Sequence, residues 1–367
     1  RAVPVSAGPQ APSSPHAEDE LLQGWGRTTP ARSEVLHVEQ ASEVVDAVRA
    51  AGRDGVIARG LGRSYGDPAQ NAGGLVLDGP ARSGLVDIDL HTGVATILAG
   101  TSLDDLMKWL IPLGWFVPVT PGTRIVTVGG AIASDIHGKN HHKRGSWCNH
   151  VLSLRLVDGT GNVRDVSPTV EPDVFWATAG GMGLTGIILD ATVQLARVGS
   201  SRLIVDSDRA PDLDSVMAMM IDGDDDYDYC VAWIDVMARG RHLGRSVLDR
   251  GRFATRSEVL HAGVERPSDY APHMLPSVPD VFPSGLVNKL TVKVKEIKKQ
   301  IVILKKKLIV ATEVKKVEIK KNIVVLKKTV VKITKKIKDI KVIIKKLTAP
   351  VPLIPDDNTK PVDPFKP

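Results

Sequence analysis

The sequence lacks several features that define common classes of protein. Its two cysteines, Cys148 and Cys230, form no pattern with neighbouring His, Asp or Glu, so we expect free thiols and no metal site. No uncharged apolar run of about 18 residues and no signal-peptide core occur, so we expect no membrane span and no export signal. No G-x-x-x-x-G-K-[ST] loop is present, and no G-x-G-x-x-G opens a helix, which excludes the common nucleotide-binding loops.

Lysine is scarce in the first part of the chain, and arginine is missing from the last part. Residues 1–288 hold 22 Arg and 3 Lys against 35 acidic residues, a net charge of −10. Residues 289–367 hold 23 Lys and no Arg against 7 acidic residues, a net charge of +16. The overall net charge of +6 is therefore the sum of two oppositely charged segments. The acidic part lacks the excess of basic residues that is typical of nucleic-acid-binding domains.

The abrupt change of composition near Asn288 indicates that the segments before and after it differ in origin. A fusion, a shifted reading frame, a synthetic sequence and a natural basic extension all remain open.

Apolar residues recur every three or four positions over 294–308 and 326–347, which favours one or two helices. Most of these are Val or Ile, which favour strands instead. A basic amphipathic helix could bind a membrane surface, an acidic partner, the acidic part of the chain or a second copy.

Composition and length together predict five segments. Residues 1–18 are rich in Pro, Ala and Ser, without apolar periodicity. The predicted segments are a disordered tail (1–20), a cofactor-binding domain (21–196), a partial second domain (197–288), the Lys-rich segment (289–347) and a Pro-rich tail (348–367).

Strands and helices are mixed along residues 21–288, which predicts an α+β fold. Residues 42–51 read as a helix that Ser42 caps, and residues 101–111 as a helix with a hydroxyl cap and a buried stripe. Short strands are predicted at 55–59, 75–78, 85–89 and 94–99, and a β-hairpin at 152–166 that turns near Gly159–Gly161.

Two glycine-rich segments carry the chemistry. The first spans Ala58–Asp67 and the second Thr127–His142, each after an apolar strand-like run. Glycine lets main-chain N–H groups approach a bound anion, and a diphosphate is the natural guest of such loops. The pattern predicts a large dinucleotide held by loops rather than by a helix N-terminus, which points to FAD.

These segments also carry a family resemblance over about residues 24–289. The chain resembles the FAD-binding oxidoreductases of the vanillyl-alcohol-oxidase type, and within them the oxidases of a polyprenyl-phosphoribose. The shared runs are Ala58-Arg-Gly-Leu-Gly-Arg-Ser-Tyr-Gly-Asp67, Pro121-Gly-Thr-Arg124, Val128-Gly-Gly-Ala-Ile-Ala133, Asp135-Ile-His-Gly-Lys-Asn-His-His142, Phe175-Trp-Ala-Thr178, Gly183-Leu-Thr-Gly-Ile-Ile188 and Pro279-Asp-Val-Phe-Pro283.

The resemblance implies which residues serve the cofactor and the reaction. A two-subdomain FAD-binding domain would be followed by an incomplete substrate domain. FAD, held without a covalent bond, would contact Arg59, Gly60, Leu61, Gly62, Arg63, Ser64, Tyr65, Gly66, Asp67, Gly122, Thr127, Val128, Gly129, Gly130, Ser134, His137 and Ile188. Tyr65, His137, Lys139 and Trp233 would face the reaction. Packing alone would equally explain Tyr65 or Trp233.

The implied reaction is hydride transfer from C2′–H of the polyprenyl-phosphoribose to flavin N5, giving the 2′-keto sugar used in cell-wall arabinan synthesis. An NADH-dependent reductase partner would complete the epimerisation. A lipid-linked substrate implies a protein of the bacterial cytoplasm or cell envelope, with peripheral membrane contact.

After Asn288 the sequence departs from the family. The family's Tyr-x-x-Lys-Asp-Ser-Arg segment, which carries a flavin-contacting Tyr and a catalytic Lys, has no counterpart in residues 289–367. Two alternatives therefore stay open beside the oxidase: a non-catalytic flavin-binding module with a basic anchor, and another sugar or alditol oxidase.

Overall fold

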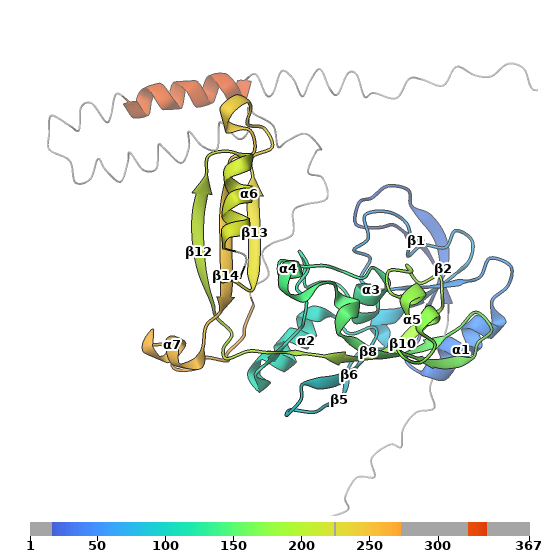
Figure 1. The fold of residues 1–367 in the computed structure, drawn as a ribbon. Coiled ribbons are helices and arrows are strands. Elements are labelled where there is room, and N and C mark those ends of the chain that lie inside the picture. Colours follow the sequence, from blue (N-terminus) through green and yellow to red (C-terminus); the bar gives the residue numbers. More distant parts are fainter. Residues whose placement is uncertain (1–16, 224, 273–321, 336–367) are drawn as a thin grey trace, which may run out of the picture. The chain divides into compact units, whose positions relative to one another are not determined.

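The computed structural model describes residues 17–223, 225–272 and 322–335. The chain divides into two compact units, residues 1–273 and 274–367 (Figure 1). In the second unit the described residues 322–335 form a helix, in agreement with the helix predicted for the Lys-rich segment. The compositional boundary at 288/289 and the Pro-rich tail lie outside the described residues, so these assignments stay predictions.

The first sheet of the larger unit has the order β1-β2-β4-β3. Its strands are β1 (Ala17–Leu22), β2 (Ala31–His37), β3 (Val56–Arg59) and β4 (Leu75–Asp78). Strands β2, β4 and β3 run parallel, and β1 is antiparallel to β2. The predicted disordered tail is thus too long, because residues 17–20 pair with β2 and the following Leu22 is buried with Val35.

Helix α1 (Ala41–Ala50) forms as predicted, but Ser42 does not cap it. The N-cap is Gln40, and the Glu43 carboxylate reaches back to accept the N–H groups of Glu39 and Gln40 at 2.8 and 2.9 Å. An N3 carboxylate can satisfy the free donors of the first turn as well as an N-cap hydroxyl does. The helix buries Val44 and Val48 against β4 and β10.

The second sheet is antiparallel and holds the larger core. Its order is β5-β6-β10-β8-β9, from β5 (Leu85–Ile88), β6 (Val94–Leu98), β8 (Val151–Val157), β9 (Val163–Val166) and β10 (Ile187–Gln194). The predicted hairpin is confirmed as β8–β9. Helix α2 (Leu103–Leu110) buries its apolar stripe on this sheet, and Ser102 Oγ caps it by accepting the Asp105 N–H. The α+β prediction is confirmed.

Short elements complete this core. Helix α3 (Val128–Ala133) lies in the second glycine-rich segment, which the sequence predicted as a loop, and α5 (Pro172–Thr178) was not predicted. The others are α4 (His141–Arg144), β7 (Trp115–Phe116) and β11 (Ala196–Arg197), of which β7 and β11 pair.

The third sheet has the order β12-β14-β13, and its strands lie within residues 203–253. It comprises β12 (Leu203–Ala210), β13 (Tyr229–Ile234) and β14 (Ser246–Phe253), with α6 (Leu213–Asp222) packed on one face through Val216. This sheet falls in the predicted partial substrate domain, and its assignment to substrate stays a prediction.

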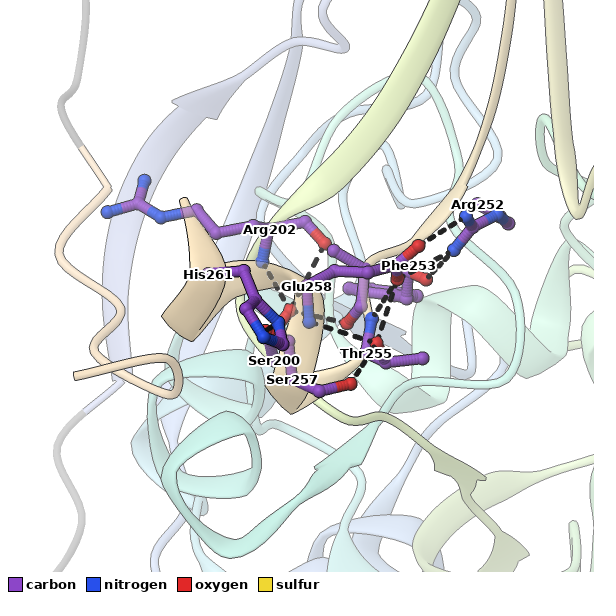
Figure 2. Close-up of polar contacts among 9 residues, drawn as sticks. Ser200, Arg202, Arg252, Phe253, Thr255, Ser257, Glu258 and His261 are labelled. Atoms are coloured by element: carbon purple, nitrogen blue, oxygen red, sulfur yellow. Dashed lines mark hydrogen bonds and ion pairs between the residues drawn. The ribbon is translucent and has the colours of Figure 1, made fainter. Parts of the chain in front are cut away.

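Helix α7 (Arg256–His261) follows β14 and is held by a capping box (Figure 2). Thr255 Oγ1 accepts the Glu258 N–H at 3.3 Å, and a Glu258 oxygen accepts the Thr255 N–H at 2.8 Å. The other Glu258 oxygen accepts from Arg252 Nη2 at 2.7 Å. Together the ion pair with Arg252 and the hydrogen bonds of Thr255 lower the pKa of Glu258 to about 2.

The capping box gives stability a defined pH dependence. Because the folded state lowers the pKa of Glu258, its contribution is present above the ordinary value of 4.5 and is lost as pH falls through about 2. We expect Glu258→Gln to flatten the loss of unfolding free energy between those two pH values, as measured by urea unfolding. The exposed Glu265→Gln serves as control, and equal slopes in both variants would contradict the prediction.

Candidate functional site

A cavity of about 480 Å³ opens between the first and second sheets. It lies where β3 ends, α3 begins and β10 passes, and its volume is typical of small-molecule sites. Thirteen residues predicted to bind the cofactor line it, drawn from both glycine-rich segments and β10: Arg59, Gly60, Leu61, Gly62, Arg63, Ser64, Tyr65, Gly66, Thr127, Gly129, Gly130, Ser134 and Ile188.

The loop after β3 offers main-chain donors to a ligand. Among the described residues, no acceptor is found for the N–H groups of Leu61 to Asp67. Gly62 makes the turn at φ 63°, a left-handed conformation that costs a residue with a side chain about 1–2 kcal/mol. The Arg59 guanidinium braces the loop by donating to the carbonyls of Ala69 and Gln23 at 3.0 and 2.8 Å. Burial lowers the pKa of Arg59, and Asp78 opposes that shift.

The beginning of α3 is closed to an anion. The N–H groups of Val128 and Gly129 donate to the carbonyls of Thr101 and Ala99 at 2.9 and 2.8 Å, and Gly130 N–H donates to Thr127 Oγ1. The second segment is therefore a helix, but its first-turn donors are already satisfied. The loop after β3 is therefore the candidate for binding an anion, and the predicted contribution of the second segment to that binding stays a prediction.

The two segments touch each other closely at Gly60. A Cβ on Gly60 would lie 2.5 Å from Thr127 Oγ1, and one on Gly129 would lie 3.1 Å from the Ala99 Cβ. A side chain at Gly60 would collide with Thr127 at the start of α3, and one at Gly129 would crowd Ala99. The free donors and this narrow cradle together fit a diphosphate.

Several residues that line the cavity were not predicted from the sequence. Val38, Val44, Leu77, Ile187 and Leu189 form an apolar side that belongs to the core around α1. Their sequence signal is that of ordinary packing residues. Arg82, Ile136, Met182 and Gly183 also line the cavity.

Arg82 is the cation of this wall and is held from β10. Its Nη1 donates to the Leu189 carbonyl, and its Nη2 lies 3.8 Å from Asp190. Asp190 also receives Arg155 Nε at 2.9 and 3.0 Å. Burial lowers the pKa of Arg82, while the Asp190 charge opposes that shift. The signals that could have suggested this cluster are an Arg between two predicted strands and an Asp directly after the apolar run at residues 187–189.

Some predicted residues lie outside the lining. Val128 is fully buried in the core, and Asp67 and Gly122 do not line the cavity. Of the predicted reaction residues only Tyr65 lines it, with 78% of its surface exposed. His137, Lys139 and Trp233 are all exposed and do not line it, so their roles stay predictions.

The segment with His137 and Lys139 is nevertheless tied to β13. The Cys230 N–H donates to the Lys139 carbonyl at 2.8 Å, and the Lys139 N–H donates to the Thr120 carbonyl at 3.3 Å. Further along, Lys143 Nζ lies 3.3 Å from an Asp225 carboxylate oxygen. The start of β13, the strand that carries Trp233, is therefore hydrogen-bonded to the segment that carries His137.

Comparison with known proteins identifies the cavity-bearing domain. Residues 33–167 match the family of FAD binding domains. They form an FAD binding domain, and FAD is its cofactor. The two-subdomain fold and the resemblance found in the sequence are confirmed by this match.

Three relatives place the domain among oxidoreductases. The chain is 46% identical over 275 residues to decaprenylphosphoryl-β-D-ribose oxidase of Mycolicibacterium smegmatis, covering 74% of this chain and 60% of that protein. It is 31% identical to an uncharacterized oxidoreductase in the fasciation locus of Rhodococcoides fascians, over 51% of this chain and 44% of that protein. It is 30% identical to cytokinin dehydrogenase 4 of Arabidopsis thaliana, over 41% and 30%. The chain therefore spans less than two thirds of each.

None of the helices in the described ranges is both long and apolar enough to cross a membrane. No group of three or more His, Cys, Asp or Glu in those ranges is arranged to hold a metal ion. The prediction that the protein has no metal site stays a prediction.

Proposed function

We propose that the protein is an FAD-dependent oxidase of a polyprenylphosphoryl-β-D-ribose, acting on the 2′-hydroxyl. The observation that carries the proposal is the 46% identity over 275 residues to decaprenylphosphoryl-β-D-ribose oxidase. FAD held in this cavity would supply the hydride acceptor for oxidation of the 2′-hydroxyl.

In this proposal the loop after β3 binds the diphosphate. Its free N–H groups from Leu61 to Asp67 supply the donors, and Arg82 adds a positive charge on the opposite wall. The apolar side of the cavity, with Val44 and Leu77, suits a ring system of the cofactor. We place the flavin end near Ser134 and Met182, because they adjoin the segment with His137.

His137 does not line the cavity. Its position outside the lining supports FAD binding without a covalent bond. Its ring instead lies 5.9 Å from that of His141 in an edge-to-face arrangement. We assign His137 and Lys139 to orienting the substrate and exchanging the hydroxyl proton. Trp233 on β13 lines the sugar side.

Partners follow from the proposed chemistry. A 2′-keto product requires an NADH-dependent reductase to return the opposite epimer. A lipid-linked substrate requires contact with a membrane surface, for which the basic segment after Asn288 is the candidate region.

The test is anaerobic mixing of the purified full chain with farnesylphosphoryl-β-D-ribose, followed by visible absorption. Bleaching of the flavin bands supports the proposal, and acid precipitation that leaves the flavin in solution supports its non-covalent attachment. A yellow protein that no phosphoribose bleaches would favour the non-catalytic flavin module. Bleaching by free sugars or alditols with rapid reoxidation by O₂ would favour another oxidase.

A further inference from the structure

The third sheet has two unlike faces. Helix α6 covers the face that carries Ala210 and Leu248 (Figure 1). Because side chains alternate along a strand, the opposite face carries Val205, Trp233 and Val247, whose surfaces are 50%, 63% and 40% exposed. The open face thus presents an exposed indole next to Val247, its partner in the strand register.

A carboxylate stands at the centre of the open face. Asp249 lies between Ser207 on β12 and Val231 on β13 in the strand register. Ser207 Oγ donates to one Asp249 oxygen at 2.6 Å, and Trp233 Nε1 donates to the other at 3.0 Å. Hydrogen bonds to an ionised carboxylate are stronger than those between neutral groups. The exposed indole, which would otherwise sample several rotamers, is thus held along the sheet.

The base of this face adjoins the FAD binding domain. The rings of Tyr229 and Phe253 lie 5.8 Å apart, and Phe253 packs edge-to-face on Phe116 at 5.0 Å. Beside them Cys230 N–H meets the Lys139 carbonyl. Trp233 follows Cys230 by three residues, or about 10 Å along the strand. The end of the open face near Tyr229 therefore lies beside the segment with His137 and Lys139.

We propose that Asp249, together with Ser207, is a positioning residue that fixes the Trp233 indole as a platform for the sugar ring of the substrate. The inference rests on the proposed function. The flat face of an indole suits the C–H face of a ribose, while the bond to Asp249 satisfies its N–H. Asp249 acts only through Trp233 and makes no contact with the reacting atoms.

The experiment labels the full chain with 5-fluorotryptophan and records ¹⁹F NMR spectra. The sequence has six Trp, and the resonance that disappears in Trp233→Phe is that of Trp233. We expect Asp249→Leu to shift this resonance and to weaken binding of farnesylphosphoryl-β-D-ribose about tenfold, as followed by the flavin spectrum. Asp249→Asn keeps an acceptor for the indole and is expected to restore part of both. Asp214→Asn, which removes an exposed charge from α6, should change neither.

The outcomes separate the two proposals. A double variant Trp233→Phe/Asp249→Leu should bind no worse than either single variant, since both act through one platform. An unmoved Trp233 resonance in Asp249→Leu, or weakened binding in Trp233→Phe with unchanged binding in Asp249→Leu, overturns the role of Asp249. An FAD-bound wild-type chain that binds no phosphoribose overturns the proposed function, and the platform with it.

Discussion

The Gly62→Val chain is expected to purify without FAD. Gly62 has φ 63°, where a β-branched residue is strongly strained. An added Cβ would also lie 2.6 Å from Arg59 Nη2, which donates to the Gln23 carbonyl while Nη1 donates to the Ala69 carbonyl. The displaced loop would lose at least two charge-assisted N–H bonds, or about 3 kcal/mol, so FAD affinity should fall about 100-fold or more. The ratio of visible flavin absorbance to protein absorbance measures it.

Gly52→Val is the matched control for this variant. Gly52 is exposed, and no atom lies within 4 Å of the position where its Cβ would be. We expect it to retain a full complement of FAD. The Gly62→Val protein should still show a cooperative melting transition, since its strain is confined to one loop. A folded Gly62→Val protein with normal flavin content would refute the assignment of the diphosphate to this loop.

Asp190→Ala is expected to lower the free energy of unfolding by about 3–5 kcal/mol. The Asp190 side chain is only 6% exposed and lies between Arg155 and Arg82, and the Arg82 side chain is 13% exposed. Removing the carboxylate leaves the Arg82 charge buried without its partner, and the pKa of Arg82 is already lowered by burial. Urea unfolding, followed by tryptophan fluorescence, measures the loss.

Asp87→Ala is the control, because Asp87 is an exposed carboxylate in the same sheet and its removal should change stability by less than about 0.5 kcal/mol. The double variant Asp190→Leu/Arg82→Leu should recover part of the stability lost in Asp190→Ala, since it leaves only one of the two charges. A loss below 1 kcal/mol in Asp190→Ala would show that Arg82 gains little from this carboxylate.

Secondary structure was predictable where local signals agreed. Helix α2 combines an apolar stripe with a hydroxyl cap at Ser102, and it appeared as expected. Helix α3 was missed, because Gly129 and Gly130 disfavour helix and its first turn is held by bonds to Ala99 and Thr101 besides the Thr127 side-chain cap. The strand in β1 was missed for a similar reason, since its edge pairing with β2 has no local signal.

The site was predictable in its glycines and not in its walls. Gly60, Gly62 and Gly129 stand out because a side chain would obstruct them. Val44 and Leu77 carry the same pattern as any core residue, and only the tertiary fold turns them toward the cavity. Arg82 became part of the site through Asp190, more than a hundred residues later in the chain.

The strand order of the second sheet bears on how the protein is made. Strand β10 lies between β6 and β8, yet it leaves the ribosome roughly ninety residues after β6 ends at Leu98. At usual rates of synthesis this delay is about 5–20 s, during which β6 has no neighbour on that side. Ile188 and Leu189, which complete the cavity, arrive with β10. FAD can therefore be captured only after this strand is inserted, and the nascent chain must be kept from aggregating until then.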